Sequence, residues 1–201
     1  DGLFITDYIA KNFPALLISG KSPANWMADT LNENIANMDV LNDIGKLKAS
    51  KFANLDPNDV EAQYESFLGD SCMLIAAGAN VDPVRAKSLF VEALKPPCIS
   101  ICISGNIPIA MTKWAPNMLN QIAGLETPTP KQIDLAAILI EAGVRVKDET
   151  LMRKITEVIE TKKTNADRAN DAPDGILNTG GLNSLVVGEK KATDDAAAVQ
   201  L

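Results

Sequence analysis

Two stretches of the chain share one order of apolar and polar positions: a helical period of apolar residues, a glycine, a short connection and a second helical period. The first stretch covers residues 73–94 and contains Gly78, and the second covers residues 138–159 and contains Gly143. Their matched positions lie about 65 residues apart. A glycine directly after an apolar helical period is typical of a helix C-terminus, because glycine adopts left-handed backbone freely. The pattern therefore predicts two related helix–glycine–helix units, with Gly78 and Gly143 as helix C-caps.

Helix starts are marked along the chain by a capping residue followed by proline. The capping oxygen accepts a hydrogen bond from a free amide of the first turn, and a proline at the first helical position has no amide to leave unpaired. The pairs that carry this signal are Ser22-Pro23, Asp56-Pro57, Asp82-Pro83 and Thr129-Pro130. Asp148-Glu149 predicts the start of a last helix, which is expected to fade at residues 161–163.

Other stretches are patterned less clearly. Residues 98–103 form a short apolar run, which fits a strand and a buried helical turn equally well. Residues 106–123 have helical spacing, with a kink or break expected at Pro116. Residues 38–52 continue the helical pattern of the preceding segment, with Gly45 as its weak point.

The amino-acid composition agrees with a helical fold. Hydrophobic residues make up 46% of the chain and aromatic residues only 4%, so the core must consist of aliphatic side chains, which favours packed helices over β-sandwiches. The sequence predicts an all-α multi-helix bundle over residues 1–163 and an extended polar C-terminal tail over residues 164–201. Within the bundle, residues 1–55 are expected to form an N-terminal helical arm, and residues 56–163 the repeated helix pairs.

The predicted tail is rich in Asn, Asp, Gly, Lys, Thr and Ala, and it has too few large apolar residues to fold alone. Ordering about forty polar residues opposes folding by tens of kcal/mol of backbone entropy, so a neighbouring protein must supply the contacts. The segment best able to bury apolar side chains against a neighbour, or to add a strand to one, contains Leu182, Leu185, Val186 and Val187. These residues are predicted to anchor the tail.

The charge balance argues against nucleic acid as a partner. The formal net charge is −7, and such a field repels phosphate backbones. A local basic excess could still contact nucleic acid through Arg145, Lys147, Arg153 and Lys154. Acidic residues are interleaved with these cations, so helical ion pairs are favoured over nucleic-acid binding.

Histidine is absent from the sequence, which removes the commonest general base near neutral pH and the most frequent metal ligand. The cysteines are Cys72, Cys98 and Cys102. A structural zinc site or an iron–sulfur cluster needs a fourth thiolate or a histidine. The cysteines are therefore interpreted as small buried core residues, and no metal or cofactor is expected.

Carboxylates also occur at helical spacing. Glu61 and Glu65 fall on one face of a predicted helix, and Asp70 lies further along it. Paired carboxylates can act as acid and base or hold magnesium, but only where burial or a metal separates their pKa values. A solvated helix face is favoured, and no catalytic residue is predicted.

These features favour a non-catalytic structural subunit of a large homo- or hetero-oligomeric assembly, such as a virion coat or scaffold protein or an accessory subunit of a multi-protein complex. A helical binding module for a protein or a small ligand is the second hypothesis, and a carboxylate- or magnesium-dependent enzyme is the third. No apolar run approaches the roughly 18 to 20 residues of a transmembrane helix. A soluble or peripheral protein in a reducing compartment or a virion is expected, and the first residue, Asp1, suggests a processed N-terminus.

Overall fold

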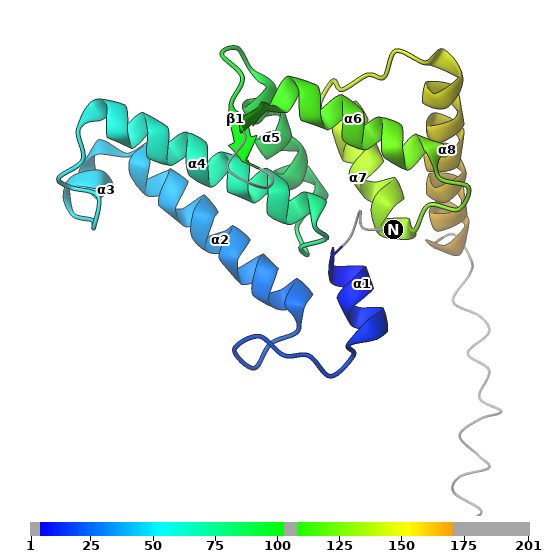
Figure 1. The fold of residues 1–201 in the computed structure, drawn as a ribbon, viewed down its shortest axis with the longest axis horizontal. Helices are drawn as coiled ribbons and strands as arrows, with labels where there is room; N and C mark the ends of the chain where they lie inside the picture. The colour runs from blue at the N-terminus through cyan, green and yellow to red at the C-terminus, as the bar shows by residue number, and fades with distance from the viewer. Residues whose placement is uncertain (1–4, 103–107, 171–201) are drawn as a thin grey trace, which may run out of the picture. The chain divides into compact units, whose positions relative to one another are not determined.

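The computed structural model describes residues 5–102 and 108–170 of the chain. These residues form an all-α multi-helix fold, as the sequence predicts, with one small two-stranded sheet (Figure 1). The helices are α1 (Ile5–Asn12), α2 (Pro23–Leu41), α3 (Ile44–Lys48), α4 (Pro57–Ala76), α5 (Pro83–Leu94), α6 (Met111–Gly124), α7 (Pro130–Glu141) and α8 (Glu149–Asn170). Of the described residues, those up to Thr161 and those from Lys162 belong to separate compact units, and the contacts given below lie within the first.

The helices that were predicted from a cap followed by proline begin at those prolines. At α4, a carboxylate oxygen of Asp56 accepts hydrogen bonds from the amides of Asn58 at 2.8 Å and Asp59 at 3.0 Å. At α7, Thr129 and Gln132 cap each other reciprocally: the Thr129 amide donates to the Gln132 side chain at 2.7 Å, and the Gln132 amide donates to the Thr129 hydroxyl at 3.4 Å. The local sequence is sufficient to place these starts because each cap satisfies amides within its own first turn.

The two glycines of the repeated pattern adopt the same left-handed backbone. Gly78 has a φ of 99° just after α4, and Gly143 has a φ of 98° just after α7. The amide after Gly78 donates to the Leu74 carbonyl at 3.0 Å, and the amide after Gly143 donates to the Leu139 carbonyl at 2.9 Å. Each helix therefore ends in a Schellman motif, in which these bonds satisfy carbonyls of the last turn.

The two units share this cap but not the packing of their helices. The first unit packs α4 directly against α5, whereas α7 packs against α5 and α6. Within the described residues, α8 makes no comparable contact with α7. The second connection is also one residue longer, because α5 is capped by Asp82 and α8 by Asp148. The two units are thus most alike at their caps, and superposition of the two helix pairs stays a prediction.

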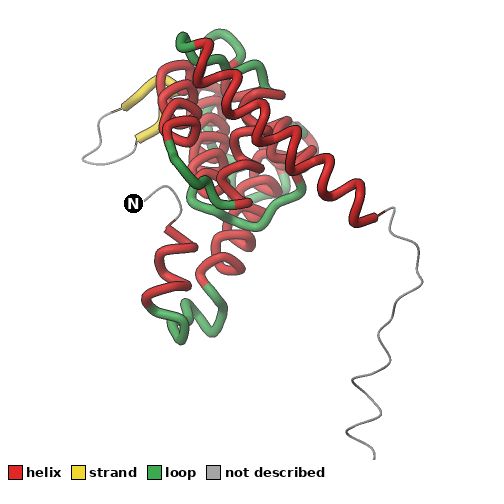
Figure 2. The backbone as a smooth tube through the Cα atoms, turned by 90° about the vertical axis from the view of Figure 1, so that its right-hand side faces the viewer, coloured by secondary structure: helices red, strands yellow, loops and turns green. Residues whose placement is uncertain are grey.

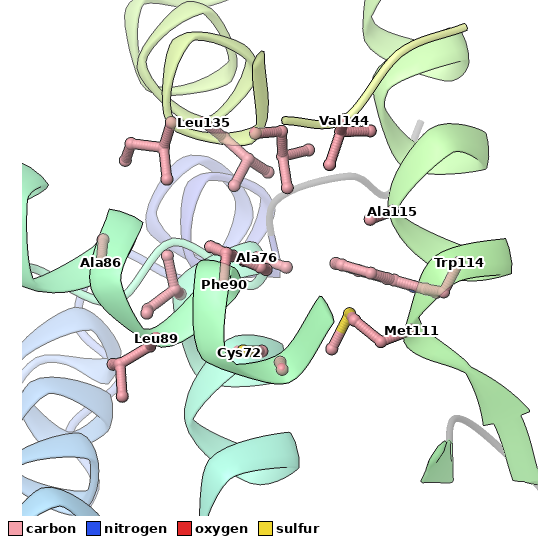
Figure 3. Packing of buried hydrophobic residues seen from close by; sticks show 14 of the residues in the cluster. Cys72, Ala76, Ala86, Leu89, Phe90, Met111, Trp114, Ala115, Leu135 and Val144 are labelled. Atoms are coloured by element: carbon pink, nitrogen blue, oxygen red, sulfur yellow. The ribbon is translucent and has the colours of Figure 1, made fainter. Parts of the chain in front are cut away.

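The core contains apolar side chains from α2, from α4 to α7, from the first strand and from the first part of α8. Figure 1 shows α2 and α4 side by side, and this is the most extensive helix contact in the described chain. Phe90 is fully buried, and its ring stacks on Trp114 with centroids 6.3 Å apart and planes 6° from parallel (Figure 3). Aliphatic side chains fill the rest of the core, as the low aromatic content predicts.

Within the short apolar run at 98–103, residues 100–102 form a strand. Strand β1 (Ser100–Cys102) pairs antiparallel with β2 (Pro108–Ala110), with Ile101 opposite Ile109. Figure 2 shows this pair of strands beside the helices. A β-carbon on Gly69 of α4 would lie 3.1 Å from the Ile101 side chain, so the glycine allows the strand to approach the helix closely. The helix that was predicted from residue 106 consequently begins at Met111, and it continues through Pro116.

Two further helix boundaries correct the sequence prediction. The break after α2 falls at residues 42–43, before Gly45, because the Asp43 carboxylate accepts from the Gly45 amide at 2.9 Å and starts a new helix. Helix α8 continues to Asn170 and does not fade at residues 161–163. The polar residues after 161 contain no proline or glycine before Pro173, and these are the two residues that oppose a helix most strongly. None of the described helices combines the length and the apolar character that crossing a membrane requires.

Candidate functional site

The first part of the predicted N-terminal arm, residues 5–26, displays large apolar side chains to solvent, and the name arm is used below for these residues alone. Its exposed members are Tyr8, Phe13, Leu16, Leu17 and Trp26, which together we call the arm surface. Leu17 is 60% exposed and Phe13 is 56% exposed. Elsewhere in the described chain, only Ile44 and Val84 among the large apolar residues reach this exposure. Single exposed apolar residues are ordinary on protein surfaces, but a concentration of them in one short segment is typical of an interaction site.

A tight turn shapes the arm between α1 and α2. The Ile18 amide donates to the Lys21 carbonyl at 2.8 Å, and the Lys21 amide donates back to the Ile18 carbonyl at 3.0 Å. The two residues between them, Ser19 and Gly20, have φ values of 51° and 77°. Positive φ at both central positions is the geometry of a type I′ hairpin turn. The backbone of the turn is thus paired internally, while Leu16 and Leu17 beside it stay exposed.

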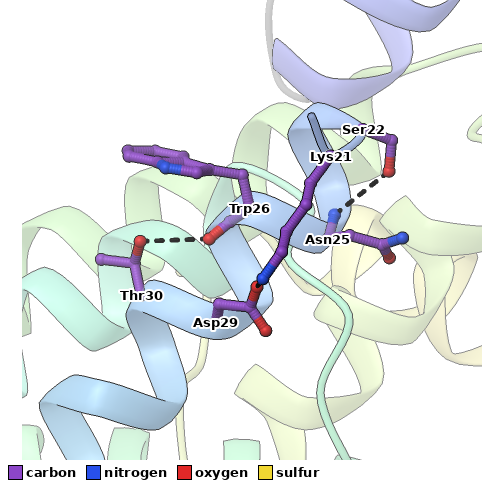
Figure 4. A network of polar contacts seen from close by, with 6 residues as sticks. All are labelled: Lys21, Ser22, Asn25, Trp26, Asp29 and Thr30. Atoms are coloured by element: carbon purple, nitrogen blue, oxygen red, sulfur yellow. Dashed lines mark hydrogen bonds and ion pairs between the residues drawn. The ribbon is translucent and has the colours of Figure 1, made fainter. Parts of the chain in front are cut away.

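A polar network fixes the base of the arm to the start of α2 (Figure 4). The Lys21 ammonium pairs with the Asp29 carboxylate, and the Asn25 amide donates to the Ser22 hydroxyl at 3.4 Å. The Thr30 hydroxyl donates to the Trp26 carbonyl at 3.1 Å. In Figure 4 the Trp26 indole points away from the Lys21–Asp29 pair. The network therefore positions the backbone of the arm surface without covering its side chains.

The arm surface was not predicted from the sequence. Residues 15–18, which include Leu16 and Leu17, form an apolar run that no prediction assigned to a surface. One signal was present: the run lies between Pro14 and Gly20, outside any helical period. An apolar run that belongs to no amphipathic element has no predicted partner in the core, and such a run is a reasonable indicator of a contact surface.

A basic groove lies between α6 and the connection that leads to α8. Its volume is about 580 Å³, and its lining residues are Thr112, Lys113, Pro116, Asn117, Asn120, Arg145, Val146, Lys147, Asp148 and Leu151. Arg145 is held in place because its Nη1 atom donates to the Ile140 carbonyl at 2.8 Å and to the Val144 carbonyl at 2.7 Å. The Ile140 carbonyl belongs to the last turn of α7, where a cation also complements the helix dipole, and the Val144 carbonyl lies just beyond that helix.

The connection after Gly78 lines a smaller pocket of about 160 Å³ against α7. Its walls are mostly apolar, with Ile75, Val81 and Ile138 among them, and Lys131 and Asp134 supply the charged side chains. The two glycine-terminated connections therefore face pockets of different size and chemistry, although their backbone caps are the same.

The remaining basic residues take part in local contacts, as the interleaved charges suggest. Arg153 lies 3.8 Å from the Glu157 carboxylate. The Lys154 ammonium donates to the Leu125 carbonyl at the end of α6, at 2.8 Å. Of the candidate cations, Lys147 together with Arg145 faces the basic groove.

The cysteines do not share one environment. Cys72 is fully buried in the core, and burial raises the pKa of its thiol far above the ordinary value. The interpretation of Cys98 as a core residue is wrong, because this side chain is only partly covered. Its sulfur lies 3.4 Å from the Thr112 hydroxyl, and hydrogen bonds from Thr112 lower the pKa of the Cys98 thiol. Cys102 lies in β1, and its side chain is outside the described part of the chain.

The carboxylates that were considered as an acid–base or magnesium site lie along α4. Glu61 is exposed and Glu65 is partly buried, and partial burial raises the pKa of Asp70. No cluster of three or more metal-ligating side chains occurs in residues 5–102 and 108–170.

The predicted tail anchor, Leu182 to Val187, lies outside the described residues. Comparison of the chain with protein-family models, curated proteins and solved structures finds no match.

Proposed function

We propose that the chain is a non-catalytic subunit of a protein assembly and that it binds a neighbouring protein through the arm surface. The observation that carries the proposal is the concentration of exposed large apolar side chains in the arm, on a backbone that a type I′ turn and the Lys21–Asp29 pair hold in place. Coat, scaffold and accessory subunits belong to this class.

Two physical arguments support the arm surface as a contact site. Aromatic side chains such as Tyr8, Phe13 and Trp26 supply large contact areas, and such residues are enriched at protein interfaces and their energetic hot spots. Burial of a Leu or Phe side chain stabilises a complex by about 1.5 to 3 kcal/mol before the cost of association. The positioned backbone lowers that cost, because part of the ordering has already taken place.

The histidine-free sequence supports the non-catalytic part of the proposal. Acid–base catalysis near neutral pH relies most often on histidine, and nucleophilic serine or cysteine sites usually pair with it. Helical assembly subunits, in contrast, need apolar contact surfaces and no titrating group near pH 7. The arm surface and the absence of histidine therefore favour the same class of function.

The test is the mass of the natively purified protein in solution, measured by size-exclusion chromatography with multi-angle light scattering. The wild-type material is expected to elute as a species well above the 21.5 kDa of one chain. A variant with Phe13→Ser, Leu16→Ser and Leu17→Ser is expected to elute at the mass of one chain. Circular dichroism should show the same helix content for both proteins, because none of these side chains is buried within the chain. The thermal midpoint of the variant should be the lower one, because the wild type gains stability from assembly.

The matched control substitutes exposed apolar residues outside the arm, Ile44→Ser with Val84→Ser, which are 72% and 75% exposed in the wild type. This control is expected to keep the mass of the native assembly. A wild-type protein that elutes as a single chain, or an arm variant that keeps the assembly mass, contradicts the proposal. So does a control variant that dissociates as fully as the arm variant.

A further inference from the structure

We propose that the basic groove between α6 and the start of α8 binds a small hydroxylated organic phosphate of the sugar-phosphate class. This site is separate from the arm surface and goes beyond the assembly function, so the two proposals can fail independently. Its volume of about 580 Å³ falls within the range of roughly 300 to 1,000 Å³ that small-molecule pockets occupy.

The charge of the groove is opposite to that of the chain. Lys113, Arg145 and Lys147 line it, and the only acidic residue in the lining is Asp148. The chain as a whole has a formal net charge of −7, so a surface with three cations and one carboxylate has a local charge of the opposite sign. A phosphate monoester carries about −1.5 to −2 charges at pH 7, which is close in magnitude and opposite in sign to the net charge of this lining.

The single carboxylate of the groove is already engaged by the protein. Asp148 accepts hydrogen bonds from the amides of Thr150 at 2.9 Å and Leu151 at 3.2 Å, at the N-terminus of α8. These bonds and the helix dipole offset its negative charge, so its repulsion of an incoming anion is reduced. Arg145 is fixed by its bonds to two backbone carbonyls. Neither Lys113 nor Lys147 forms an ion pair within the described residues.

The arrangement of donors fits a phosphate group better than a single carboxylate. A phosphate presents three terminal oxygens that accept strong hydrogen bonds, and guanidinium and ammonium groups both bind it well. The amides of Asn117 and Asn120 add neutral donors on the α6 wall. Val146 and Leu151 supply an apolar surface for the body of the ligand.

Polar side chains on the α6 wall give a reason to expect hydroxyl groups on the ligand. Thr112, Asn117 and Asn120 all line the groove. A carboxamide supplies both a donor and an acceptor, so Asn117 and Asn120 can each pair with a ligand hydroxyl group. The Thr112 hydroxyl, which also lies 3.4 Å from the Cys98 sulfur, adds a further acceptor. A sugar phosphate satisfies these acceptors and the cations together.

The experiment is isothermal titration calorimetry on the full chain, with glucose 6-phosphate, ribose 5-phosphate and AMP as phosphorylated probes. Glucose, inorganic phosphate and a single-stranded oligonucleotide are the comparison ligands. At least one phosphorylated probe is expected to bind saturably with a dissociation constant below about 1 mM. Glucose and inorganic phosphate are expected to bind at least roughly tenfold more weakly, because each supplies only part of the chemistry.

The variant that tests the site combines Lys113→Gln with Lys147→Gln, since neither side chain holds the fold together through an ion pair among the described residues. It is expected to weaken binding roughly tenfold or more. The matched control, Lys48→Gln with Lys95→Gln, removes the same charge from exposed positions outside the groove. It is expected to bind like the wild type.

Several results overturn the inference. If no phosphorylated probe binds with a dissociation constant below about 1 mM, the groove is not a site for this class of ligand. If both double variants weaken binding equally, the probe binds somewhere other than the groove. If inorganic phosphate binds as tightly as the sugar phosphates, the ligand class is wrong. If the oligonucleotide binds more tightly than every small probe and depends steeply on salt, the groove is a nucleic-acid contact instead.

Discussion

The arm and the helical body, which comprises the described residues from 27 to 161, place tryptophan in opposite surroundings. Trp26, at the base of the arm, is 37% exposed, whereas Trp114 in α6 is 6% exposed and stacks on Phe90. Both tryptophans lie on helices with apolar neighbours in the sequence. The difference comes from the elements around them: α4, α5 and α7 supply apolar side chains to the core with Trp114, while the arm contacts α2 and leaves its outer side uncovered.

This difference has consequences for local stability. The body buries large side chains from several helices, and each fully buried one contributes about 1.5 to 3 kcal/mol. The arm is held by a turn, a cap and an exposed ion pair, and an exposed ion pair contributes about 0 to 1 kcal/mol. We therefore expect the arm to open locally far more often than the body unfolds. The predictions below test how separate the two regions are.

The largest expected effect concerns the thiols of the body. Cys72 is fully buried and Cys98 is partly exposed. Because the thiolate is the reactive form, the lowered pKa of Cys98 should speed its alkylation at pH 7, and the raised pKa of Cys72 should slow it. Cys72 should react about 10³-fold or more slowly, because its exposure requires the body to open. Iodoacetamide labelling, followed by peptide mass mapping, measures each site.

Urea and one variant complete this test. Above the unfolding midpoint the two thiols should react at similar rates, and Cys98→Ser should remove the fast phase alone. Comparable rates for Cys72 and Cys98 in the native protein would mean that Cys72 becomes accessible without unfolding of the body, which contradicts the high local stability expected of the body.

The two tryptophans provide the next test. Trp114→Ala removes a buried ring that stacks on Phe90, and such substitutions lower the free energy of unfolding by about 3 to 5 kcal/mol. Trp26→Ala should change it by less than about 0.5 kcal/mol, as surface substitutions do. Urea denaturation followed by circular dichroism measures both values. Acrylamide should quench the fluorescence of Trp26 in the native protein far more than that of Trp114, and equal quenching would contradict the assignment of the two environments.

Much of the fold could be predicted because its signals are local. Asp56 with Pro57 and Thr129 with Pro130 satisfy amides of their own first turns, so four or five residues are enough to place a helix start. Gly78 and Gly143 mark helix ends for the same reason, because their carbonyl partners lie in the preceding turn. The all-α class follows from these signals together with the aliphatic composition.

The features that were missed depend on residues distant in the sequence. The strand at Ile101 forms against β2 and over Gly69, and neither contact can be read from the apolar run alone. The partial exposure of Cys98 depends on the start of α6. The basic groove joins α6 to a connection about thirty residues later in the chain. Sequence patterns show which residues are apolar or charged, but tertiary packing decides which of them meet.

The smallest expected effect, and the sharpest comparison of the two regions, comes from two glycines with similar backbones. Gly143 in the body has a φ of 98° and Gly20 in the arm has a φ of 77°, and a β-carbon added at either position would meet no atom within 4 Å. Alanine at each position should therefore introduce backbone strain alone, of about 1 to 2 kcal/mol. Gly143→Ala should lower the free energy of global unfolding by this amount, because α7 unfolds with the body. Gly20→Ala should lower the free energy of global unfolding by less than about 0.5 kcal/mol, since the arm can relax without unfolding the body. It should instead speed hydrogen exchange at the Ile18 and Lys21 amides that close the turn.

Gly143→Asn is the control, because asparagine tolerates left-handed backbone and should restore part of the loss. If Gly20→Ala destabilises the whole protein as much as Gly143→Ala does, the arm folds as part of the body, and its exposed side chains are not on a separately mobile element.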